Sequence, residues 1–190
     1  MRCSITSLNG GRIMILESLS KCLATQIKEA DPEGPGSIEV LTYGIGLKLN
    51  LFSCLVLTAL FGTILDTLAG SFFALFSFMA LRRFSGGVHL PITLCSIVTA
   101  MAASIIPLIT MSPSAILCVT TISFVLMLIY APQYYEAVRR SRWEPWYKWI
   151  AACIVGGNFV LVSNILALAF CLQAVLIVPL WKGREEVNWN

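Results

Sequence analysis

Charge is what this sequence has least of. Asp, Glu, Lys and Arg together make up 12% of its 190 residues, whereas 57% of the residues are hydrophobic. The mean hydropathy of +0.82 is far above that of a soluble domain. No soluble core can bury so much apolar sequence, so the composition predicts an integral membrane protein. Histidine occurs only once, and we therefore expect no metal site and no cofactor.

Six apolar runs with almost no charge follow one another along the chain. They cover residues 49–65, 67–81, 94–110, 114–130, 149–166 and 167–181. Most are close to the minimum of about 17 residues for a spanning helix. Very short breaks at Asp66, at 111–113 and near Leu166 join the runs in pairs. The sequence predicts an all-α membrane bundle of about six transmembrane helices in three hairpins. The last pair can instead form one long tilted helix, because no turn residue marks its break.

Positive residues predict the orientation of this bundle. None of the 13 Lys and Arg residues lies in the three short breaks. They occur in the N-terminal segment, at the foot of the first run, near residues 82–83, in the loop 133–148 and in the C-terminal tail. Because Lys and Arg remain cytoplasmic, both termini and the connection around residue 89 are predicted to be cytoplasmic.

A segment of a different kind precedes the bundle. Apolar residues recur at helical spacing between residues 12 and 30, which predicts an N-terminal amphipathic helix. The Gly- and Pro-rich stretch that follows cannot continue a helix. We therefore divide the chain into residues 1–36, the amphipathic helix and its linker; residues 37–182, the transmembrane bundle; and residues 183–190, a cytoplasmic tail.

Aromatic and basic residues gather between residues 133 and 148. Such a mixture at a membrane edge is typical of anchoring to the lipid bilayer. Binding of a peptide helix is the functional alternative. A net charge of only +3 and the predicted bilayer make nucleic acid an unsuitable partner.

The seven cysteines do not have the positions of a disulfide framework. Most lie within apolar runs or at their edges, where a thiol usually behaves as a small hydrophobic side chain. We therefore predict free thiols.

The single histidine, His89, lies six positions before Cys95, between two apolar runs. An imidazole beside a thiol can take its proton and later return it to a leaving group. Pro91 suits the first position of a helix, which places Cys95 near a helix N-terminus. The helix dipole and the nearby Arg82 and Arg83 favour a thiolate there. The pattern predicts a thiol protease; alternatively, His89 is an interfacial side chain and Cys95 only packs.

The string Arg-Arg-Phe-Ser-Gly-Gly-Val-His at residues 82–89, followed by a cysteine, resembles the signature of the accessory gene regulator B (AgrB) family of bacterial membrane endopeptidases. Glu-Val-Leu-Thr-Tyr-Gly at 39–44 and Tyr-Ala-Pro at 130–132 are similar to two further elements of that family, in the same order. Cys95 follows His89 by six positions, one fewer than is usual in the family. The resemblance covers roughly residues 37–182.

This resemblance implies a multi-pass cysteine endopeptidase of the bacterial cell membrane. It would remove the C-terminal part of a small membrane-associated quorum-sensing propeptide and hold the new carboxyl as a thioester on Cys95. Transfer of that acyl group to a side chain of the peptide would close a thiolactone or lactone ring, with His89 as general base and then acid. The family also implies a homodimer. A multi-span peptide transporter or a non-catalytic membrane scaffold is the competing interpretation.

Further residues are expected to support this site or to bind substrate. They are Arg82, Arg83, Ser85, Gly86, Gly87 and Glu39. The two arginines can hold an acidic stretch of the propeptide or only anchor the topology. Backbone N–H groups of the two glycines, or those at the start of the Pro91 helix, can stabilise an oxyanion. Glu39 can orient His89 or bind substrate, or it can be a solvated acid that favours the helix dipole.

Overall fold

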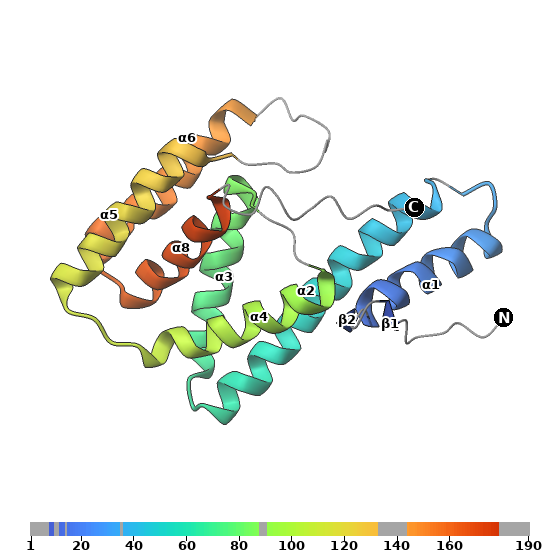
Figure 1. The fold of residues 1–190 in the computed structure, drawn as a ribbon, viewed down its shortest axis with the longest axis horizontal. Helices are drawn as coiled ribbons and strands as arrows, with labels where there is room; N and C mark the ends of the chain where they lie inside the picture. Colours follow the sequence, from blue (N-terminus) through green and yellow to red (C-terminus); the bar gives the residue numbers. More distant parts are fainter. Residues whose placement is uncertain are drawn as a thin grey trace.

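The computed structural model describes residues 8–9, 12–13, 15–34, 36–87, 91–132 and 144–178. Helices make up nearly all of this part (Figure 1). They run over Ile15–Ala30 (α1), Ile38–Ile64 (α2), Leu68–Ser85 (α3), Ile92–Ile105 (α4), Pro113–Tyr130 (α5), Glu144–Gly156 (α6), Asn158–Leu161 (α7) and Asn164–Ile177 (α8), with a 3₁₀ turn at Ile106–Leu108 (η1). The all-α bundle is therefore confirmed.

The N-terminal helix begins later in the chain than the sequence pattern predicted. Leu8–Asn9 (β1) and Arg12–Ile13 (β2) form a two-stranded antiparallel hairpin, so the predicted helix start at residue 12 is wrong by three residues. Two glycines separate these strands in the sequence. The amphipathic helix itself is confirmed as α1.

Each of the six apolar runs falls at least partly on a helix, but not every one of these helices has the length of a membrane span. In the described part, α2 and α5 are long and apolar enough to cross a membrane. Only 17% and 22% of their apolar windows are buried, unlike the core helices of a soluble protein. The 14 residues of α8 reach about 21 Å, less than the ~30 Å of a hydrocarbon core.

Local signals mark the turns between paired helices. Asp66 adopts a positive φ of 55° between α2 and α3, and the Ser112 side chain caps α5. Val162 adopts φ 47° and the Ser163 side chain caps α8, so the last break lies before the position near Leu166 that we predicted. A left-handed valine has no sequence signature, because β-branched residues rarely adopt that conformation. One long tilted helix is excluded by this turn.

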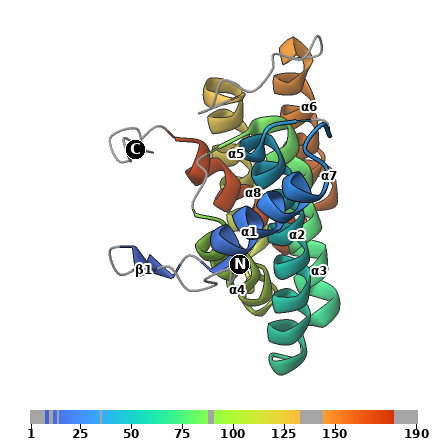
Figure 2. The ribbon, with the colours of Figure 1, turned by 90° about the vertical axis from the view of Figure 1, so that its right-hand side faces the viewer.

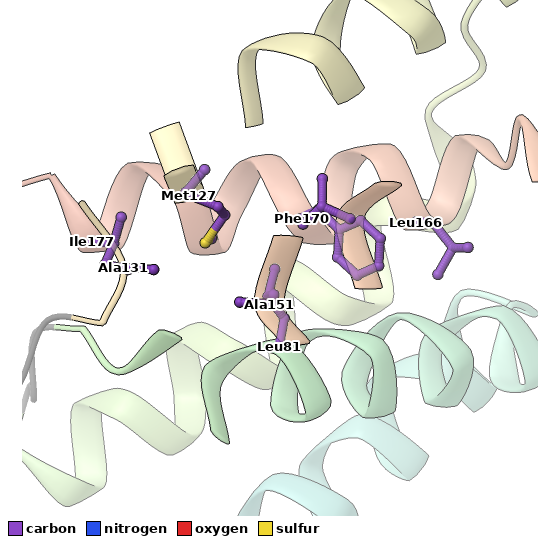
Figure 3. Close-up of a cluster of buried hydrophobic side chains, with 9 residues drawn as sticks. Leu81, Met127, Ala131, Ala151, Leu166, Phe170 and Ile177 are labelled. Carbon is purple, nitrogen blue, oxygen red and sulfur yellow. The ribbon is translucent and has the colours of Figure 1, made fainter. Parts of the chain in front are cut away.

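The helices form two packed groups that share α3 and α8. On one side α1 lies against α2 and α4; on the other, α5 and α6 pack against α8 and α3 (Figures 1 and 2). One buried cluster joins α3, α5, α6 and α8 around Phe170 (Figure 3). A second joins α2, α3, α4 and α8 around Leu75 and Phe78. Many large apolar side chains still point outward, such as Phe52 and Ile129.

The ends of the helices gather at two opposite sides of the bundle. The end of α3 contacts the end of α8 through Ser85 and Gln173 and the start of α6 through Phe84 and Tyr147. At the other side, Gly70 of α3 approaches Pro107 of η1. The three short turns between paired helices belong to this second side, as Figure 1 shows for the α2–α3 turn.

Among the described residues, the prediction of free thiols is correct for five cysteines and wrong for Cys22. Cys54, Cys95, Cys118, Cys153 and Cys171 are free. Cys22 is disulfide-bonded. It lies on α1, outside the apolar runs from which free thiols were argued.

A buried amide stabilises the turn between α6 and α8. The Asn158 side chain is fully buried; its Nδ2 donates to Thr120 Oγ1 at 2.9 Å and to the Ser163 carbonyl at 3.2 Å. Its Oδ1 accepts from the Ser163 N–H at 2.9 Å. This amide therefore satisfies backbone groups that the break leaves without helical partners.

We expect Asn158→Leu to lower the free energy of unfolding by about 2–3 kcal/mol, because it leaves buried polar groups unpaired. Thermal unfolding in detergent micelles measures the loss. Thr121→Val is the matched control, since the Thr121 hydroxyl is exposed and donates only to the Leu117 carbonyl of its own helix. Equal midpoints for the two variants would contradict the assignment.

Candidate functional site

The end of α3 is a glycine turn, as the sequence predicted. The Gly86 N–H donates to the Arg82 carbonyl at 3.0 Å and closes the helix. Gly86 and Gly87 have φ of 72° and 125°. Such values are strained for any residue with a Cβ, so this turn requires glycine at both positions.

An amide from a distant helix fixes this turn. Gln173 of α8 is fully buried, and its Nε2 donates to Ser85 Oγ at 2.9 Å and to the Gly86 carbonyl at 2.6 Å. Because a carbonyl can only accept, the second contact assigns the amide nitrogen. The Gln173 Oε1 atom is buried and has no hydrogen-bond partner among the described residues. Sequence reasoning missed Gln173, since a single amide in an apolar run does not reveal its partner.

The two arginines of the motif occupy the last turn of α3. The Arg82 guanidinium lies 5.8 Å from the centre of the Phe78 ring, within cation–π range, and Arg83 is exposed. Cations at this end of a helix also complement its dipole. Both positions suit the anchoring that we predicted, and Arg83 is free to meet solvent or a ligand.

Cys95 lies at the N-terminal end of α4. It is a free, partly exposed thiol, and its N–H donates to the Pro91 carbonyl at 2.8 Å, the first backbone bond of the helix. Pro91 occupies the N-cap and Ile92 the first helical position, one residue later than predicted. The Cys95 Sγ atom is 4.0 Å from Thr99 Oγ1. The predicted location near a helix N-terminus is confirmed.

Two predicted features, His89 and most of the 133–148 loop, lie outside the described residues. Glu39 is exposed in the first turn of α2, and its carboxylate has no hydrogen-bond partner in the described part of the chain. Within the same part, no group of three or more His, Cys, Asp or Glu residues is arranged to hold a metal ion.

The start of α4 contacts α1 through the carboxylate of Glu17, a residue of the first turn of α1. Glu17 Oε1 accepts from the Thr93 N–H at 3.1 Å, and Glu17 Oε2 accepts from the Thr93 hydroxyl at 2.7 Å. The Thr93 hydroxyl oxygen accepts in turn from the Leu16 N–H at 3.1 Å. Figure 1 shows the beginning of α1 beside the beginning of α4.

A second polar contact holds α4 against α2. The Ser96 hydroxyl donates to Asn50 Oδ1 at 2.7 Å and lies 3.0 Å from the Ile92 carbonyl. Cys54 Sγ lies 3.8 Å from the Ser96 carbonyl. The residues on both sides of Cys95 along α4 are thus held by neighbouring helices.

We expect Gln173→Leu to reduce the free energy of unfolding by about 1–3 kcal/mol, because Ser85 and the Gly86 carbonyl lose their donor. Denaturation in detergent micelles measures it. Leu172→Met, a volume-conserving change on the same helix, serves as control and should cost under about 1.5 kcal/mol. If Gln173→Leu is no less stable than the control, the amide does not stabilise the turn.

Comparison with known proteins places this arrangement in a family. Residues 19–182 match the family model of accessory gene regulator B. An AgrB-like protein of Halalkalibacterium halodurans is 29% identical over 184 residues, which cover 92% of this chain and 93% of that relative. No solved structure matches. The matched region contains the Gly86-Gly87 turn, Cys95 and Gln173, and the chain belongs to the accessory gene regulator B family.

Proposed function

We propose that this chain is a membrane-embedded cysteine endopeptidase that processes a quorum-sensing propeptide and supports its cyclisation. The observation that carries the proposal is Cys95, a free and partly exposed thiol at the N-terminal end of α4. The glycine turn before it carries the family motif, and membership of the AgrB family supports the quorum-sensing role.

The proposed reaction moves a proton and an acyl group between the propeptide, Cys95 and His89. His89 takes the proton from Cys95 Sγ, and the thiolate attacks the scissile carbonyl of the propeptide. Collapse of the tetrahedral intermediate breaks the C–N bond, His89 returns the proton to the leaving amine, and the acyl group remains as a thioester. His89 then takes the proton from a thiol or hydroxyl of the peptide, whose attack on the thioester carbonyl breaks the S–C bond and closes the ring. The proton returns to Cys95 Sγ, which restores the free thiol.

The start of α4 offers groups for the developing oxyanion. The first three N–H groups of a helix have no partner within it. In α4 these belong to Ile92, Thr93 and Leu94, and Glu17 already accepts from Thr93. The N–H groups of Ile92 and Leu94 have no hydrogen-bond partner in the described part, and we propose them as oxyanion donors.

Co-expression with a candidate quorum-sensing propeptide tests the activity. We expect Cys95→Ser and His89→Ala to reduce cleavage by a factor on the order of 10³ or more, as for other nucleophile and base removals. Mass spectrometry should find a thioester adduct at Cys95 in the wild type. Cys118→Ser, which alters another free and exposed thiol, should cleave normally. Unchanged cleavage in both site variants would contradict the roles of Cys95 and His89 and would favour a transporter or a non-catalytic scaffold.

We further propose six spans with both termini cytoplasmic. The arrangement of helix ends supports it: the end of α3, the start of α6 and the end of α8 meet at one side, and the short turns lie at the other. The positive residues 82–83 belong to the first side, which the positive-inside rule assigns to the cytoplasm. The disulfide at Cys22 favours the opposite orientation, because disulfides persist in oxidising compartments.

Labelling of intact cells with a membrane-impermeant maleimide distinguishes the two orientations. Single cysteines at Asp66, Ser114 and Leu161 in a cysteine-free background should react from outside, and cysteines at Glu39 and Arg83 only after lysis. All five positions are exposed. The reverse pattern would invert the topology, and labelling of only one of the three turns would reduce the number of spans.

A further inference from the structure

We propose that Glu17 of the N-terminal amphipathic helix is a positioning residue for Cys95. This inference rests on the proposed function, since it assigns α1 a role in the same reaction. Glu17 accepts both from the Thr93 N–H and from the Thr93 hydroxyl, two residues before Cys95 on α4. The two partners are 76 positions apart in the sequence, so the contact exists only in the folded chain.

The beginning of α4 lacks a cap of its own. Ser37, Ser112 and Ser163 occupy the N-caps of α2, α5 and α8, and each side chain accepts from a backbone N–H of its helix. At α4 this position is Pro91, whose side chain has no acceptor. Glu17 provides the missing acceptor, and its negative charge suits the positive end of the helix dipole. The cap of the cysteine-bearing helix therefore comes from α1.

Close packing fixes where α1 can lie. A Cβ added at Gly46 of α2 would lie 2.7 Å from Ile92 Cδ1 and 3.8 Å from Ser20 Oγ, so α1 and the start of α4 both approach α2 at this glycine. Ser20 and Ala24 of α1 are buried. Since α1 cannot slide along α2 without breaking this packing, Glu17 keeps a fixed position opposite Thr93.

This contact acts on the reacting groups through the first turn of α4. The Cys95 N–H donates to the Pro91 carbonyl, and that bond forms only while the first turn is helical. Among the N–H groups of the first turn, Glu17 accepts only from that of Thr93. The N–H groups of Ile92 and Leu94 therefore stay available to an oxyanion. Loss of the cap would fray the turn and displace both the thiol and these donors, and small displacements of reacting groups slow a reaction strongly.

The test measures propeptide cleavage by purified full-length protein in liposomes. We expect Glu17→Ala to lower kcat roughly 10- to 100-fold with KM little changed. Glu17→Gln, whose amide oxygen can still accept from the Thr93 N–H, should restore most of the activity. Thr93→Val, which keeps the Thr93 N–H and removes only the hydroxyl, should have an intermediate effect.

A cap of another helix provides the matched control. Ser112 accepts from the Ala115 N–H at the start of α5, and Ser112→Ala should leave kcat within about twofold. A second readout needs no substrate: mass spectrometry follows iodoacetamide alkylation of each thiol. The rate at Cys95 should change in Glu17→Ala, whereas the rate at Cys118 should not.

Several results would overturn the role of Glu17. They are a wild-type kcat in Glu17→Ala, an equal loss in Ser112→Ala, or no rescue by Glu17→Gln. Absence of cleavage by the wild type would instead contradict the proposed function. In that case the alkylation rates still test Glu17, because an unchanged rate at Cys95 would show that the cap does not position the thiol.

Discussion

Packing of α3 against α8 is the contact on which the rest of the bundle depends. Both buried clusters contain residues of these two helices: Leu81 and Phe170 in one, Leu75 and Ala169 in the other. The helices on either side, α5 and α6 or α2 and α4, complete one cluster each. The same pair of helices contributes the Gln173–Ser85 bond at the glycine turn. Stability of the bundle and geometry of the turn therefore come from one interface.

Three polar side chains satisfy the backbone where it enters or leaves a helix. Away from water an unpaired N–H or C=O costs several kcal/mol. Asn158 satisfies the turn before α8, Gln173 satisfies the turn after α3, and Glu17 satisfies the start of α4. Two of these three contacts, those of Gln173 and Glu17, lie at the two ends of the segment that connects α3 to Cys95. The described ends of this segment, at Ser85 and Gly86 and at Thr93, are thus held by α8 and α1.

The sequence allowed much of the fold to be predicted because apolar runs and their breaks are local signals. In the described part, all six runs fall at least partly on helices, and the amphipathic pattern falls on α1. Errors arose where no local signal exists. The last break lies at Val162, a residue type that gives no hint of a positive φ. Pro91 is compatible with both the N-cap and the first helical position, so its register was wrong by one residue.

The candidate site divides in the same way. Residue types and their order in the chain determined the thiol near a helix start, the glycine turn with its positive φ values, and the family. They determined these because proline, glycine and charge act on their immediate neighbours. Only the tertiary structure decided that Glu17 caps α4 and that Gln173 holds Ser85 and Gly86. Hydrogen bonds between residues 76 and 88 positions apart depend on how helices pack, and no local pattern in one sequence encodes that.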